Sequence, residues 1–257
     1  MQNKRKLLTP QMLAFEMRCV TGNPYVHIFG VGLPVVLALL ITKVAGQEMT
    51  GTAGIKIIGT TVYLGMGSLI PMAVILMGYA VSYAEELSKG IPQRLQLFGI
   101  KRSVAFCSRA AAELLFILLA CLIFFASGYL LYDLEKPVWT GLASYTACMA
   151  VFSIICLALA HGIACICRNF GRTYCVSMIL YFAFMILGGM MGISYENLPG
   201  WVQPVAKLLP VMYINRDFYK IWTGKEYNCM PMIQSFLFLG AVSAIILFAA
   251  LKQPERT

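Results

Sequence analysis

The chain has little charge. Only 12% of its 257 residues are Asp, Glu, Lys or Arg, whereas 60% are hydrophobic; soluble domains carry about 25% charged residues. The polar stretches are too short to form a separate soluble domain. Composition therefore predicts an all-α integral membrane protein, with residues 1–257 forming one membrane domain.

Motifs for nucleotide binding and hydrolysis are also missing. No G-x-x-x-x-G-K-[ST] stretch occurs, and residues 51–56 have the wrong spacing for one. H-E-x-x-H and G-x-S-x-G are absent, and two histidines are too few for most His-based sites. We expect no catalytic or cofactor site in this chain, and no ATP hydrolysis by it.

The nine cysteines do not form a disulfide or metal pattern. Cys165 and Cys167 lack the two-residue spacer and the second ligand pair of a zinc site. Most of the others fall inside apolar runs or near their ends, where a free cysteine acts as a small hydrophobic residue. We expect packing roles for them and no metal site.

Long apolar runs are what the sequence has instead. A membrane span needs roughly 20 apolar residues. Six runs qualify, at about 25–42, 57–84, 109–132, 138–167, 173–195 and 231–251. Pro71 lies within the second run and predicts a kink there.

Lysine and arginine are distributed unevenly between the two sides. With the N-terminus inside, thirteen of the 20 fall on inner segments and seven on outer ones. Inner loops carry the excess of basic residues in membrane proteins. The split predicts a multi-pass protein with both termini cytoplasmic, and it explains the net charge of +9 without a nucleic-acid partner.

An amphipathic helix is predicted before the first span, over residues 9–24. Thr9 and Pro10 suit a helix start, and a Gly-Asn-Pro stretch ends it. The apolar side is expected to hold Met12, Phe15 and Cys19, with Leu13 and Val20 as further candidates, and the polar side Gln11, Glu16 and Arg18. The helix is expected to lie at the membrane interface; a solvated tail is the alternative.

The densest polar stretch follows the second run. Glu85 and Glu86 come first, then Lys89, Gly90 and Arg94. Leu87, Ile91, Leu95 and Phe98 are spaced for one apolar side. The pattern predicts a short amphipathic helix parallel to the membrane on the cytoplasmic side, with an ordinary basic loop as the alternative.

A further run, 179–201, carries a single charge, Glu196, and leads into a stretch rich in Pro, Gly and Trp. Proline cannot continue a helix, and tryptophan prefers the membrane interface. The chain is expected to leave the membrane, turn and dip back as short helices before Pro210, on the extracellular side between the fifth and sixth spans.

Two ionisable residues fall within the predicted spans. Glu113 lies one turn beyond Arg109, so a local ion pair is expected; a proton carrier is the alternative. His161 is expected to be a satisfied histidine between packed helices, with a proton relay as the alternative.

Small residues mark two helix faces. Gly30 and Gly32 lie in the first run, and Gly188 and Gly192 in the fifth. Such faces allow close helix contact. The contact is either within one chain or across a dimer.

The order and spacing of these features resemble the membrane subunit of an ABC-2-type exporter. The resemblance covers nearly the whole chain and rests on the interfacial helix, the six spans, the polar loop from Glu85 to Arg94 and the late Pro/Trp-rich segment. Two departures stand in the loop: Ile91-Pro92 replaces the usual Thr-Leu step, and Gly99-Ile100 stands where proline is common.

The resemblance implies a permease of the bacterial cytoplasmic membrane. Its partners would be ABC ATPase subunits, which carry ATP and magnesium, and a second permease copy or a related permease. The loop would be the ATPase-coupling helix. The re-entrant segment would hold Pro199, Trp201, Pro204, Pro210 and Tyr213. A compact form mildly favours export of a drug, an antimicrobial peptide or a lipid-like amphiphile.

Two other functions remain open. One is a proton-coupled secondary transporter that uses Glu113 and His161. The sequence shows no inverted repeat of broken spans, which counts against it. The other is a membrane scaffold without a transport role.

Overall fold

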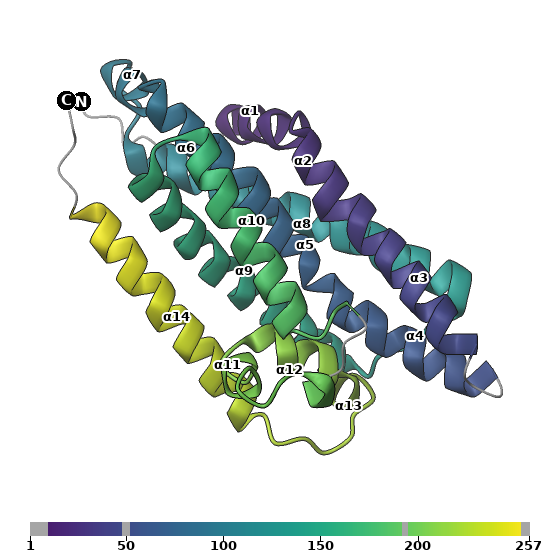
Figure 1. The fold of residues 1–257 in the computed structure, drawn as a ribbon. Helices are drawn as coiled ribbons and strands as arrows, with labels where there is room; N and C mark the ends of the chain where they lie inside the picture. The colour runs from purple at the N-terminus through teal and green to yellow at the C-terminus, as the bar shows by residue number, and fades with distance from the viewer. Residues whose placement is uncertain (1–9, 48–51, 192–194, 253–257) are drawn as a thin grey trace.

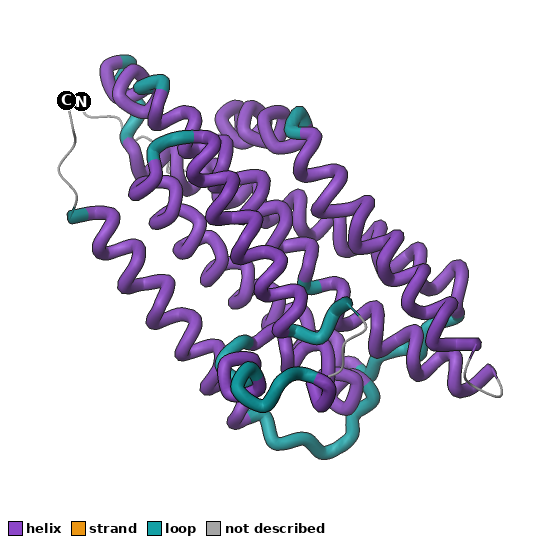
Figure 2. Tube along the Cα trace, in the orientation of Figure 1, coloured by secondary structure: helices purple, strands orange, loops and turns teal. Residues whose placement is uncertain are grey.

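The computed structural model describes residues 10–47, 52–191 and 195–252. Within these ranges every regular element is a helix, and Figure 2 shows the helices joined by short loops. The predicted Thr9 cap and Gly192 lie outside the described residues. The all-α prediction is confirmed for the part that is described.

Six helical segments are long and apolar enough to cross a membrane, as predicted. Spans 1 to 6 are Pro24–Gln47, Ala53–Ser88, Arg102–Tyr132, Trp139–Cys167, Phe170–Leu187 and Met230–Leu251. Span 1 consists of α2 (Pro24–His27), a π-helix (Ile28–Gly32) and α3 (Leu33–Gln47). Span 2 consists of α4 (Thr52–Gly67), α5 (Leu69–Met72), a π-helix (Ala73–Tyr79) and α6 (Ala80–Ser88). Spans 3 to 6 are the single helices α8 (Arg102–Tyr132), α9 (Trp139–Cys167), α10 (Phe170–Leu187) and α14 (Met230–Leu251).

Several predicted span ends differ from those of the structure, and the largest differences are in spans 3 and 5. Span 3 begins at Arg102 rather than at 109, so the helix takes in a polar first turn that hydropathy excluded. Span 5 ends at Leu187 rather than at 195. Gly189 adopts a left-handed backbone with φ of +74° directly after this helix. A glycine in that conformation ends a helix whatever the hydropathy of the residues that follow.

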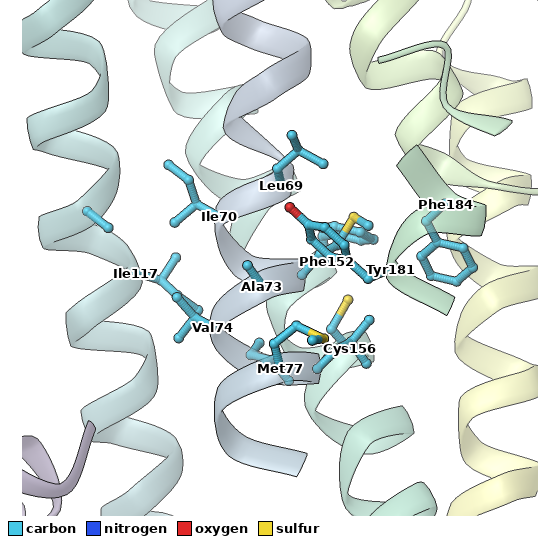
Figure 3. Close-up of a cluster of buried hydrophobic side chains, with 14 of the residues drawn as sticks. Leu69, Ile70, Ala73, Val74, Met77, Ile117, Phe152, Cys156, Tyr181 and Phe184 are labelled. Atoms are coloured by element: carbon cyan, nitrogen blue, oxygen red, sulfur yellow. The ribbon is translucent and has the colours of Figure 1, made fainter. Parts of the chain in front are cut away.

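Span 2 is the centre of the bundle, and the most apolar stretch of this span is entirely buried. Figure 3 shows its side chains between those of α8, α9 and α10. The residues labelled there are Leu69, Ile70, Ala73, Val74 and Met77 of span 2, Ile117 of α8, Phe152 and Cys156 of α9, and Tyr181 and Phe184 of α10. The other five spans each expose part of their surface, as expected of helices that face lipid.

The helix of span 2 is interrupted near Pro71, where the sequence predicts a kink. Ser68 forms a turn, and its hydroxyl donates to the carbonyl of Gly65 at 2.8 Å. A π-helical stretch follows over Ala73–Tyr79. Because proline has no N–H, it cannot complete the regular hydrogen-bond ladder, and the backbone rearranges around it.

Short helices lie at the two ends of the bundle (Figure 1). At one end are α1 (Pro10–Thr21), which packs on α8, and α7 (Ile91–Leu97). We call this the α7 end. At the other, the α12 end, lie a 3-10 turn (Tyr195–Asn197) and the helices α11 (Gln203–Ala206), α12 (Pro210–Arg216) and α13 (Phe218–Trp222).

Candidate functional site

Arg109 of α8 is the centre of the polar contacts at the α7 end. Its side chain is buried, and Nη1 donates to both carboxylate oxygens of Glu86, at 2.6 and 2.7 Å. Nη2 donates to the hydroxyl of Ser82 at 2.6 Å. Both partners belong to α6. These charge-assisted bonds tie span 3 to the last turns of span 2.

The predicted ion pair between Arg109 and Glu113 is wrong. The guanidinium bonds to Glu86 instead, although Glu113 lies one turn away on the same helix. Glu113 is only 2% exposed, and its Oε2 has no hydrogen-bond partner among the described residues. An Arg-before-Glu pair is the weaker order within a helix, whereas Glu86 accepts two bonds from a neighbouring helix. A buried carboxylate oxygen without a partner is costly.

Aromatic rings surround the guanidinium. The Cζ atom of Arg109 lies 5.2 Å from the ring centre of Tyr79 and 5.9 Å from that of Tyr83, within cation–π range. The hydroxyl of Tyr79 shares a 2.6 Å hydrogen bond with Nδ1 of His161 on α9, and the ring of Tyr83 stacks on His161 at 4.8 Å. The prediction of a satisfied histidine is confirmed. The network therefore reaches span 4.

Glu16 of α1 faces the bundle, so its place on the predicted polar side is wrong, whereas Gln11 and Arg18 are exposed as predicted. Glu16 is 6% exposed and Val20 is also buried, whereas Phe15 and Cys19 are exposed. Leu13 and Met17 complete the inner side at helical spacing. Burial raises the pKa of Glu16; the charge of Arg109 opposes this rise and that of Glu86 adds to it. Helix α1 thus places a carboxyl beside the Arg109 network.

The predicted coupling residues form a helix–turn–helix rather than one helix. Glu85 and Glu86 continue span 2 as part of α6, Lys89 and Gly90 make the turn, and Arg94 lies on α7. Gly90 has φ of +67°, a left-handed conformation that interrupts a helix. Residues 80–98 are hereafter the α6–α7 hairpin.

The end of this hairpin is apolar and exposed. No residue of α7 is buried, and Leu97 and Phe98 are 88% and 82% exposed. They precede Gly99, which turns the chain with φ of +81°. Large exposed apolar side chains of this kind contact either lipid or a partner in a membrane protein.

The predicted re-entrant residues divide into two groups. Pro210 is buried and begins α12, and Tyr213 on the same helix is half-buried. Pro199, Trp201 and Pro204 are exposed. The first group packs with the spans, and the second lies on the surface of the α12 end.

Glu135 holds the α12 end together, and sequence reasoning missed it. Its carboxylate accepts a 2.5 Å hydrogen bond from the hydroxyl of Tyr219, and its carbonyl accepts one of 2.9 Å from Nε1 of Trp222. Burial, with Glu135 adding to it, raises the pKa of Tyr219 to about 12. The partners lie more than 80 positions along the chain, so no local pattern indicates the contact.

The glycines of the predicted small-residue faces differ in environment. A side chain on Gly30 would meet Val74 of span 2 at 2.9 Å, and one on Gly188 would meet Val211 of α12 at 3.2 Å. Both therefore allow close packing within the chain. Gly32 is exposed.

The chemistry of the site is structural and electrostatic. In the described ranges, no group of three or more His, Cys, Asp and Glu is placed to hold a metal ion, and the nine cysteines are free thiols. The Arg109 network instead joins α1, α6, α8 and α9 around the base of the α6–α7 hairpin. A displacement of this hairpin would be passed to three spans.

Comparison with known proteins gives one family match. A family model described as ABC-2 type transporter matches residues 9–223, which include the Arg109 network and the helices α11 to α13. No curated protein matches the chain.

Proposed function

The chain belongs to the ABC-2 type transporter family, since residues 9–223 of its 257 match the family model, and on this premise we propose that it is the permease subunit of an ATP-driven exporter. Residues 1–257 form one membrane domain that builds the translocation path with a second copy or a related permease. A separate ABC ATPase subunit binds ATP and Mg²⁺ and drives the transport cycle.

The observation that carries this proposal is the bond between the α6–α7 hairpin and span 3. The ATPase binds the exposed Leu97 and Phe98. Its movement displaces the hairpin, and the bonds of Arg109 to α6 pass the displacement to α8. Packed elements of this kind shift as rigid bodies between discrete arrangements. The π-helix of span 2 is the position at which this central helix bends.

The proposed sidedness puts the α7 end in the cytoplasm and the α12 end outside, in the cell membrane. The helices α11 to α13 then form the re-entrant segment that caps the path. Leu97→Cys tests this, because position 97 is 88% exposed. A membrane-impermeant maleimide is expected to label it only after the cells are opened. Labelling of intact cells would reverse the sidedness.

The proposed substrate is a drug, an antimicrobial peptide or a lipid-like amphiphile. In the described ranges the α12 end carries only short helices. Such a surface suits release of small or amphiphilic molecules more than recognition of a large folded cargo.

Co-expression with an ABC ATPase encoded beside this chain, followed by purification, tests the function. The double variant Leu97→Ser, Phe98→Ser is expected to lose the ATPase and its transport while still inserting and folding. Leu130→Ser is the matched control. Leu130 is 84% exposed, but it lies near the C-terminus of α8, far from the α7 end. A double variant that still binds the ATPase and transports normally would refute the coupling role.

A further inference from the structure

A hollow lies at the α7 end, on the side of α14. It occupies about 1420 Å³, including space open to the surroundings, and is lined by residues of α6, α7, α8, α9 and α14. Figure 1 shows the last turns of α14 at the same end of the bundle as α6 and α7. Arg109, Glu86 and Glu113 do not line it. Tyr83 and His161 do line it, so the hollow borders the Arg109 network without including its ion pair.

Two arginines give the hollow its charge. Arg102, in the first turn of α8, and Arg168, directly after α9, both line it. They lie on the same hollow although 66 positions separate them in the sequence. No Asp or Glu is among the described residues that line the hollow. The site is cationic.

The two arginines differ in their remaining contacts. Arg168 donates from Nε to the carbonyl of Cys165 at 3.1 Å, and its terminal nitrogens have no hydrogen-bond partner among the described residues. Arg102 has a contact of its own within the chain and contributes chiefly charge. Ser103 adds a hydroxyl beside them.

Part of the remaining wall is apolar and continues onto an exposed helix surface. Leu87, Phe106 and Leu251 line the hollow. Leu251 and Phe248 of α14 are exposed, and the Nζ atom of Lys252 lies 4.5 Å from the ring centre of Phe248. A basic pair at the end of the spans, next to an exposed apolar helix, complements a molecule with an anionic head and a hydrocarbon tail. A free phosphate would contact only the two arginines and would leave the apolar surface of α14 uncovered.

We propose that this hollow binds the head-group phosphate of an anionic phospholipid, whose acyl chains lie along α14. Arginine binds phosphate oxygens through paired N–H groups, and basic hollows between spans on the cytoplasmic side attract anionic lipids. The assignment to the cytoplasmic leaflet rests on the sidedness in the proposed function. The assignment of the ligand as an anionic phospholipid rests on the lining residues alone and is independent of the sidedness.

The test measures lipid binding to the purified chain without any ATPase. Native mass spectrometry in detergent compares phosphatidylglycerol with phosphatidylcholine of the same acyl chains. Phosphatidylglycerol is expected to bind preferentially. Each basic residue near a charged membrane contributes about a fivefold change in affinity, so Arg102→Gln with Arg168→Gln should weaken binding roughly 30-fold. Arg168→Lys keeps the charge and should retain most of the binding.

Arg172→Gln is the matched control, since Arg172 is exposed at the same end of the bundle but does not line the hollow. An equal loss in this variant, or an unchanged preference in the double variant, would overturn the proposal. Inorganic phosphate that competes fully with the lipid would mean a free-anion site instead. If the double variant does not fold by size-exclusion chromatography, Arg168→Gln alone should still show a fivefold loss.

Two outcomes separate this proposal from the proposed function. Loss of ATPase binding with unchanged lipid affinity in the double variant would make the hollow an ATPase contact, and the lipid proposal fails. Labelling of Leu97→Cys from outside would reverse the sidedness, yet the affinity for phosphatidylglycerol would be the same.

Discussion

Arg109 and Glu86 join span 3 to the end of span 2 through two hydrogen bonds of 2.6 and 2.7 Å. They are 23 positions apart in the sequence: Glu86 lies on α6, within the α6–α7 hairpin, and Arg109 lies on α8. The ion pair therefore fastens the base of the hairpin to span 3. This contact makes the hairpin part of the membrane bundle rather than a loose loop.

Arg109→Gln is expected to lower the free energy of unfolding by about 3 kcal/mol, because it leaves Glu86 without its charged partner in a mostly buried position. Thermal unfolding in detergent measures this. Lys89→Gln is the control: it breaks the exposed pair with Glu85 and should cost less than about 1 kcal/mol. Equal losses in the two variants would show that the Arg109 pair is no more important than a surface pair.

Glu113→Gln is expected to leave stability unchanged or to raise it. The carboxylate is buried, and one of its oxygens has no partner among the described residues, so its removal relieves a desolvation cost. ATP-driven transport should persist. Suppose instead that the purified chain, without any ATPase, moves substrate under a proton gradient and loses this activity in Glu113→Gln. The secondary-transport alternative would then hold, and the exporter proposal would fail.

Gly90→Ala is expected to weaken coupling to the ATPase. Gly90 has φ of +67°, where a residue with a Cβ is strained by roughly 1–2 kcal/mol, and no close neighbour would obstruct the added methyl group. The strain should reposition α7 and reduce stimulation of the ATPase.

Gly200→Ala is the control for this position. It has equally open surroundings but lies at the α12 end without a positive φ. ATPase stimulation that is the same in both variants would contradict a role for the hairpin geometry.

Docking of α1 is expected to depend on pH through Glu16. Burial raises the pKa of this carboxyl above its ordinary value of 4.5, so the packed helix favours the protonated form. Its contribution to docking is full below about pH 4.5 and is lost as the pH rises through the higher pKa of the packed state. Hydrogen exchange of the amides of α1 should therefore speed up over that range beyond the intrinsic pH effect.

Glu16→Gln is expected to remove this dependence, because the amide has no proton to lose. Glu85→Gln, which changes a more exposed carboxyl on α6, should leave it in place. Protection of α1 that varies with pH in the same way in Glu16→Gln would assign the effect to another group.

The six spans could be predicted from the sequence because membrane spans need long apolar runs, and a run is a local property. The helix break near Pro71 follows equally from one residue that lacks an N–H. The ends of spans 3 and 5 were mispredicted because hydropathy does not indicate where Gly189 turns left-handed, or that Arg102 begins a helix. Glycine adopts the right-handed helical and the left-handed backbone conformations with similar ease, so the presence of a glycine does not by itself show whether a helix ends there.

The contacts of the charged side chains were decided only by tertiary structure. Glu16, Glu86 and Glu113 all carry the same carboxylate, and helical spacing favoured Glu113 as the partner of Arg109. Packing of α6 against α8 brings Glu86 within reach instead, and packing of α1 turns Glu16 inward. Sequence by itself determined that this chain enters the membrane, because the free energy of transferring apolar side chains from water to the membrane adds up along the chain. Which carboxylate meets the arginine depends on how whole helices cross, a relation that no local pattern contains.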